Sequence, residues 1–204
     1  MSVPKYRLDA IETIGRKILQ EYDPALLDGP PQAVPIETII ETKFDLTLEY
    51  YCLRKNGSIL GETIFDEGAA ILYDQDEKRY RLIAVKAGTI LVEERLCVDR
   101  LLGRLRFTCA HELGHWVLHQ KLYSGTGDVA AYEGKTSLDE SHGLVEWQAD
   151  ALATALLMPL PQIKRSFYRL RAGRSNEQLV AEMAQIFQVS KQAMRIRLET
   201  RNLI

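Results

Sequence analysis

The chain has 204 residues, of which 46% are hydrophobic and 26% charged, and a net charge of -2. This length is enough for one domain with a proper core and a small appendage. The cysteines Cys52, Cys97 and Cys109 form an odd, unpatterned set, which argues against a disulfide framework. Apolar runs of about 18 residues are absent, so we expect no association with a membrane.

The first predicted element is an amphipathic helix from Leu8 to Tyr22, which ends at the Asp23-Pro24 pair. Charged residues occupy this region in place of the apolar core of a signal peptide, and we therefore expect a cytoplasmic protein. A linker rich in glycine and proline follows. A second, short helix should carry Ile36, Ile39, Ile40 and Phe44.

Strand-forming patterns come next, over residues 46–53, 68–73 and 80–86, with a charged turn at 74–78. We expect a small, mostly antiparallel sheet that packs against the helix after it. A sheet edge can bind an extended peptide by strand addition, and residues 68–73 are our candidate for that edge.

Two histidines four residues apart, His111 and His115, mark the next helix. Positions i and i+4 lie on one helix face, so both imidazoles can reach a single metal ion at about 2.0–2.1 Å. Glu112 directly follows His111, in the position of a general base that acts on a metal-bound water molecule. Gly114 is costly in a helix and indicates close packing at that turn. An apolar stripe supports the helix, formed by Phe107, Ala110, Gly114, Val117 and Leu118.

The third ligand must come from elsewhere in the chain. Leu118 and Lys121 occupy the positions where metzincins have Gly and His, which excludes that class. His119 is one further turn along, about 12 Å from His111, so we expect it to be a packing or surface residue.

A second helix over 144–158 offers Glu146, 31 positions after His115, with Asp150 one turn later. Glu146 would complete a His2Glu site with one position open for water, and Asp150 would accept the free N–H of a ligand histidine. This is the thermolysin-like, or gluzincin, spacing. Taken alone, the two carboxylates would rather indicate a solvated helix face.

The run from Arg106 to His115, with Leu118 and His119, resembles the RFTxAHELGHxxLH block of the ImmA/IrrE family of metallopeptidases. The run from Glu146 to Pro159 is similar to the family's ExEAxxFAxxLLMP block. Gln148 and Leu152 depart from it, where the family usually has Glu and Phe. The resemblance implies a minimal gluzincin zinc peptidase, often paired with a helix-turn-helix repressor that it cleaves during stress, DNA damage or induction of mobile elements.

The loop over 121–140 connects the two metal-bearing helices and is long enough to be functional. Tyr123, Tyr132 and His142 are the side chains that could donate to an oxyanion on the scissile carbonyl. His142, four residues before Glu146, is the best placed. A solvent-facing histidine at the start of a helix is an equally good interpretation.

The C-terminal part begins after Pro159, where Pro161 opens another helix, and it ends in two short helices over 177–186 and 191–199. Val189 and Ser190, followed by a helix with Arg195 and Arg197, resemble a helix-turn-helix, which this family often carries here, although Gln188 replaces the usual turn glycine. Residues 162–204 hold nine Lys and Arg against three Glu, a local charge of +6 that leaves -8 for the rest. We expect this tail to pack on the peptidase or to bind a protein partner rather than to read DNA bases.

The expected fold class is α+β: a minimal gluzincin-like peptidase domain at 1–172 and a helix-turn-helix-like helical tail at 173–204. The expected function is zinc-dependent cleavage of a partner helix-turn-helix repressor, with His111, His115 and Glu146 on the metal and Glu112 and His142 as catalytic groups. The alternatives are a DNA-binding regulator with a structural or inactive zinc, or a toxin–antitoxin component.

Overall fold

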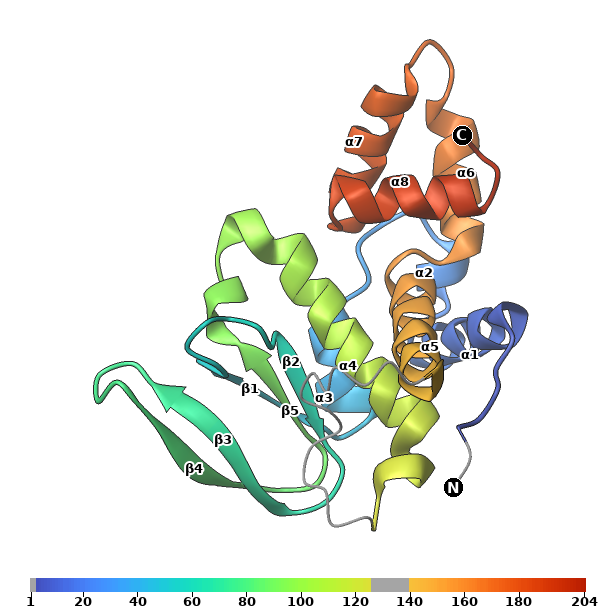
Figure 1. The fold of residues 1–204 in the computed structure, drawn as a ribbon. Helices are drawn as coiled ribbons and strands as arrows, with labels where there is room; N and C mark the ends of the chain where they lie inside the picture. Colours follow the sequence, from blue (N-terminus) through green and yellow to red (C-terminus); the bar gives the residue numbers. More distant parts are fainter. Residues whose placement is uncertain (1–2, 126–139) are drawn as a thin grey trace.

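A computed structural model describes residues 3–125 and 140–204, apart from the side chains of residues 140 and 141 (Figure 1). The N-terminal part contains α1 (Leu8–Tyr22), the short α2 (Ala25–Asp28) and α3 (Ile36–Lys43). Ile11, Ile18 and Leu19 bury the apolar face of α1, and its bounds are those predicted from the sequence.

Five strands follow in chain order, β1 (Thr47–Tyr51), β2 (Gly61–Ile64), β3 (Gly68–Asp74), β4 (Arg79–Val85) and β5 (Thr89–Glu93). They form two sheets rather than the one expected. The first has the order β1-β5-β2, with β1 and β5 parallel and β5 and β2 antiparallel. The second is the antiparallel pair β3-β4. Antiparallel pairing predominates as predicted, but β3 and β4 lie outside the sheet that packs on the next helix.

Helix α4 (Leu102–Tyr123) lies between the three-stranded sheet and α5 (Glu140–Leu157), as Figure 1 shows. Two short 3₁₀ turns, Glu94–Leu96 and Asp99–Leu101, lead into α4. Gly114 lets the two helices approach closely, because a Cβ there would lie 3.0 Å from both Cα and O of Ala149. The expectation of close packing at Gly114 is therefore confirmed. This contact sets the spacing between the helix that carries His111 and His115 and the helix that carries Glu146.

The C-terminal part consists of α6 (Leu160–Leu170), α7 (Asn176–Phe187) and α8 (Lys191–Thr200). Ser175 begins α7 with a capping box and Ser190 caps α8. Gln188 ends α7 with φ 51° and ψ 48°, the left-handed region that a turn glycine adopts most easily.

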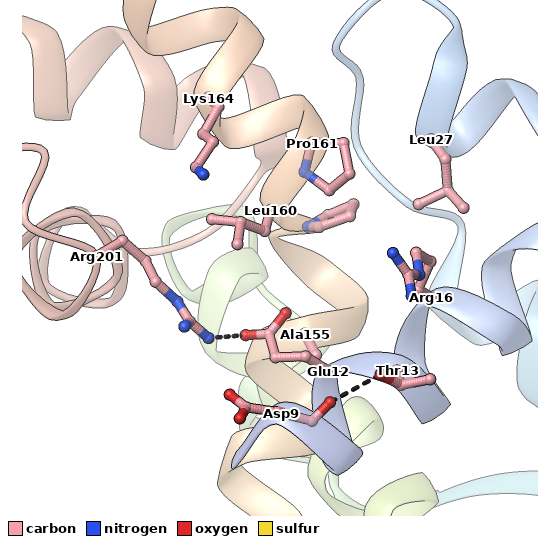
Figure 2. Close-up of a pocket in the computed structure, with 11 residues that line it drawn as sticks. Asp9, Glu12, Thr13, Arg16, Leu27, Ala155, Leu160, Pro161, Lys164 and Arg201 are labelled. Atoms are coloured by element: carbon pink, nitrogen blue, oxygen red, sulfur yellow. Dashed lines mark hydrogen bonds and ion pairs between the residues drawn. The ribbon is translucent and has the colours of Figure 1, made fainter.

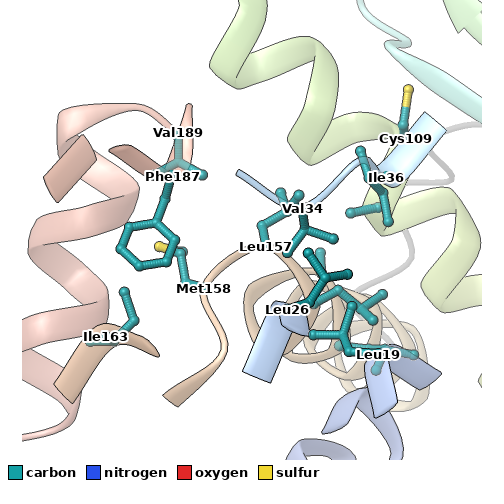
Figure 3. Packing of buried hydrophobic residues seen from close by; sticks show 14 of the residues in the cluster. Leu19, Leu26, Val34, Ile36, Cys109, Leu157, Met158, Ile163, Phe187 and Val189 are labelled. Atoms are coloured by element: carbon teal, nitrogen blue, oxygen red, sulfur yellow. The ribbon is translucent and has the colours of Figure 1, made fainter. Parts of the chain in front are cut away.

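The tail shares the hydrophobic core of the rest of the chain. Phe187 and Val189 pack in one buried cluster with Met158 and Ile163, as Figure 3 shows. Gly103, at the start of α4, lies so close to the tail that a Cβ there would be 2.7 Å from the Ser190 nitrogen. The domain boundary at residue 173 stays a prediction.

Ion pairs join the tail to α1. The carboxylate of Glu12 binds the guanidinium groups of both Arg197 and Arg201, the second of which Figure 2 draws. Arg197 is only 3% exposed and also donates to the carbonyl oxygen of Met158 at 2.8 Å. Arg195 pairs with Glu177 and Glu199. The two arginines of the helix-turn-helix-like pattern are thus engaged within the chain.

Within residues 3–125 and 140–204, no helix combines the length and the apolar character needed to cross a bilayer.

Candidate metal centre

The structure brings the ligand atoms of His111, His115 and Glu146 within 4.8 Å of one another. The Nε2 atoms of the two histidines, one turn apart on α4, lie 2.9 Å from each other. The Glu146 carboxylate, from α5, lies 3.3 Å from Nε2 of His111 and 3.4 Å from Nε2 of His115. Three donor atoms from two helices therefore face one point.

Asp150 orients the first histidine. Its Oδ1 lies 2.8 Å from Nδ1 of His111, so the ring donates its Nδ1–H to the carboxylate. The Nε2 lone pair then points toward Glu146 and His115. A carboxylate behind a histidine in this way fixes the ring tautomer and increases its basicity as a ligand.

The second histidine is oriented by a buried chain of hydrogen bonds that the sequence analysis missed. Nδ1 of His115 lies 3.2 Å from Nδ1 of His119, whose Nε2 lies 2.9 Å from Oε1 of Gln148. The Gln148 amide in turn donates to the carbonyl oxygen of Pro4 at 2.7 Å. Because an amide Oε1 only accepts, His119 must carry its proton on Nε2 and accept at Nδ1. His115 then donates from Nδ1, which leaves its Nε2 as a free lone pair.

The sequence predicted that His119 is a packing or a surface residue, and it is fully buried. Its role in orienting His115 was not foreseen. The signal was present in the spacing, since 115 and 119 are i and i+4 on one helix.

These tautomers leave two imidazole lone pairs and a carboxylate facing one another, an arrangement that only a shared cation satisfies. Without a metal, a proton takes that place: burial lowers the pKa of His111, but hydrogen bonds with Asp150 and Glu146 outweigh it and raise the pKa to about 10. Burial and the nearby His111 lower the pKa of His115 to about 3, so it stays neutral. The residues present therefore fit a zinc ion held by two nitrogens and one carboxylate, with a fourth position open.

Glu112 lies buried between α4 and β2. Burial raises its pKa to about 7, although the charge of His111 and the hydroxyl of Thr63 act to lower that pKa. The Thr63 hydroxyl donates to Oε2 of Glu112 at 2.7 Å. A Cβ on Gly61 would lie 2.5 Å from Oε1, so any larger residue there would force the Glu112 side chain to move. Neither Thr63 nor Gly61 carried a sequence signal, because β2 is a four-residue strand with no alternating pattern.

Of the candidate oxyanion donors, His142 is close enough to the proposed ligands for its charge to act on Glu146 and His115. It lies one turn before Glu146 on α5. Burial raises the pKa of Glu146, but the hydrogen bond from His111 and the charges of His115, His111 and His142 lower it, with a net downward shift. Tyr123 instead lies two turns beyond His115, with its ring 5.3 Å from that of Phe65. Tyr132 lies outside the described residues.

A cavity of about 320 Å³ opens over these groups. Its walls come from β2 and the segment before it and from α4 and α5, with Ile59, Leu60 and Gly61 facing His111, Glu112 and Glu146. The strand beside the site is therefore β2. Residues 68–73, our candidate edge, form β3 in the separate β3-β4 sheet and do not line this cavity.

Comparison with protein families gives a match to residues 74–199 for the Peptidase_M78 model, described as an IrrE N-terminal-like domain. The chain belongs to this family. The matched segment contains His111, His115, Glu146 and Asp150, whereas β2, with Gly61 and Thr63, lies before it. The family assignment agrees with the resemblance seen in the sequence.

No curated protein matches the chain. Among solved structures, the chain is similar to a protein described as "Mycobacterium tuberculosis transcriptional regulator", with a TM-score of 0.53 and 15% identity. The match covers 95% of this chain and 47% of that one, so the present chain spans about half the length of its neighbour. At this identity the likeness concerns the fold alone.

Proposed function

We propose that this protein is a zinc-dependent endopeptidase. The observation that carries the proposal is the convergence of His111, His115 and Glu146 on one point, with the carboxylate of Glu112 buried beside them. A structural zinc site usually closes all four positions with protein ligands, whereas this cluster offers three and leaves room for a substrate.

Zinc, when bound, would polarise the scissile carbonyl and make the attacking water more acidic. Glu112 removes a proton from that water and later delivers it to the leaving amine. Burial raises the pKa of Glu112, which favours both roles, because a general base works best when its pKa is near the working pH. Thr63 holds the carboxylate in place, and His142 donates to the oxyanion.

The substrate would bind as an added strand along β2. This strand is at the edge of the three-stranded sheet, since its described pairing is with β5 alone. Its first residue, Gly61, lines the cavity above Glu112. An extended peptide hydrogen-bonded to β2 would pass its backbone over the metal centre.

We further propose that the substrate is a helix-turn-helix repressor, as the family resemblance implies, and that residues 1–172 form the peptidase domain and residues 173–204 a tail that helps to recruit it. A regulatory role also fits the structural neighbour, which is described as a transcriptional regulator. Reading of DNA bases by the tail is disfavoured, because Arg197 is buried against Glu12 and Met158.

The test is co-expression with the product of the neighbouring gene, followed by mass measurement of fragments. Glu146→Ala should lose both zinc and cleavage. Glu112→Gln keeps the size of the side chain but cannot accept a proton, so it should retain zinc while cleavage falls by orders of magnitude. Undiminished cleavage by Glu112→Gln would remove this residue from the chemistry, and full zinc retention by Glu146→Ala would remove that ligand.

A further inference from the structure

A second cavity, of about 290 Å³, lies between α5 and α8. We call it the α5–α8 groove and define it by Leu8, Phe107, Trp147, Ala151, Ala193 and Ile196. Trp147 and Ala151 are i and i+4 on α5, and Ala193 and Ile196 are i and i+3 on α8, so each helix presents one face to the groove.

The groove exposes large apolar side chains from both of its helices to solvent. Trp147 is 43% exposed and Ile196 is 53% exposed, so both large apolar side chains are open to solvent. The charged groups at its margin are already paired, Asp150 with His111 and Arg197 with Glu12. A ligand in this groove would therefore meet mainly hydrophobic surface.

The groove adjoins the metal centre. Phe107 lines both cavities, and it lies one turn before His111 on the same face of α4. Asp150, which accepts a hydrogen bond from His111, also lines the groove. Because an extended chain advances about 3.3 Å per residue, a peptide over the metal ligands reaches this position within a few residues of the scissile bond.

We propose that the α5–α8 groove is a specificity subsite that binds one large apolar side chain, aromatic or aliphatic, of the peptide substrate. This inference rests on the proposed peptidase function and adds the substrate class to it. It also assigns a role to the tail, since α8 supplies Ala193 and Ile196 as one wall. The occupant is a substrate side chain because the groove borders the cavity over Glu112, with which it shares Phe107 as a lining residue.

The first test is binding, which needs no catalysis. Zinc-loaded protein is titrated with N-acetyl-phenylalaninamide and with N-acetyl-alaninamide, and tryptophan emission is followed. Trp147 lines the groove, whereas Trp116, the other tryptophan, stacks on Phe65 at 5.6 Å between ring centroids. We expect a saturable blue shift with the phenylalanine amide at concentrations at least ~10-fold below those needed for the alanine amide. Ala193→Phe, which fills the groove, should abolish the shift.

The second test is the cleavage profile on a mixture of peptides of varied sequence. The parent protein should require a large apolar residue at one fixed position relative to the cut bond. Ile196→Ala should lower kcat/KM for those peptides by roughly 10-fold or more, and Ala193→Phe should lower it further. Gln192→Ala is the matched control, because Gln192 is exposed on α8 outside the groove and should change neither binding nor profile.

The outcomes separate this inference from the function on which it rests. Cleavage with a profile that Ile196→Ala and Ala193→Phe leave unchanged would overturn the subsite and keep the peptidase. Selective binding of the phenylalanine amide without any cleavage would keep the apolar site and overturn the peptidase. Equal binding of the two amides would overturn the subsite, because the groove would then have no preference for an apolar side chain. A concentration-dependent dimer that Ile196→Ala dissociates would also overturn it, because the groove would then bind a second copy of the chain.

Discussion

At the scale of single residues, the two histidines of the metal centre are held by different partners. His111 donates to the half-exposed carboxylate of Asp150. His115 donates to His119, which is fully buried and fixed in turn by Gln148 and the Pro4 carbonyl. Gln148 stands where the family's sequence block usually has glutamate. Its amide keeps this chain of hydrogen bonds neutral, because it brings no charge into the core.

His119 is therefore expected to control zinc affinity without touching the metal. His119→Phe fills the same space but offers no acceptor to Nδ1 of His115, and we expect zinc to bind about 10 to 100-fold more weakly. His119→Gln is the matched control, since its amide oxygen can still accept, and its loss should be smaller. Competition with a chelator measures both. A Phe variant that binds zinc as tightly as the parent would show that His119 only packs.

At the scale of elements, the distance between α4 and α5 sets the geometry of the ligands, because His111 and His115 come from one helix and Glu146 from the other. The helices approach each other closely at Ala149 and Gly114, the residue before His115. Helix packing and the proposed metal ligation thus depend on the same contact.

Gly114→Ala should separate the helices. The added methyl group would lie 3.0 Å from backbone atoms of Ala149, so the backbone must shift, at a cost of roughly 1–3 kcal/mol of stability. Zinc affinity should fall as well, because Glu146 moves away from the histidines. Calorimetric unfolding and zinc titration measure the two effects.

Gly143→Ala is the control for Gly114→Ala, since Gly143 lies in α5 and a Cβ added there would meet no atom within 4 Å. It should keep zinc and gain up to about 1 kcal/mol from better helix propensity. A Gly114→Ala protein as stable as the Gly143→Ala protein would contradict the close packing.

The sequence predicted the helices well because their patterns are long and local. The apolar spacing of α1 and the i, i+4 pair of His111 and His115 each describe one helix face. The sheet was harder. β5 is buried along its whole length and so lacks the alternation of a half-exposed strand, and β2 has four residues, one of them the buried Glu62. The residues that pair between β2 and β5 lie about 30 positions apart in the chain, so no local pattern predicts the pairing. The contacts of Gly61 and Thr63 with Glu112 depend on that pairing, and the sequence could not predict them either.

At the scale of the whole molecule, the tail closes on the N-terminal helix through one carboxylate. Glu12 on α1 binds Arg197 within α8 and Arg201 just after it. The side chain of Glu12 is 17% exposed and that of Arg197 is 3% exposed, so solvent screens this pair little. The groove wall formed by α8 depends on this attachment.

Glu12 should make stability depend on pH in the acid range. Burial raises its pKa, but the hydrogen bonds and charges of Arg197 and Arg201 outweigh burial and lower it. A carboxyl group whose pKa is lower in the folded state stabilises the fold fully above its unfolded pKa of about 4.3, and this contribution is lost as the pH falls through the folded value. Glu12→Gln should therefore cost roughly 1–3 kcal/mol near pH 7, because Arg197 stays buried without its counter-ion, and the deficit should shrink as the pH falls below about 4.

Glu21→Gln, on the same helix, is the control. The Glu21 carboxylate pairs with Lys43 and is 48% exposed, so the effect of this substitution should be smaller and should disappear at high salt. Thermal unfolding of the parent and both variants across this pH range measures these effects. If the parent and Glu12→Gln showed the same dependence of stability on pH, the tail would be held by its apolar contacts alone.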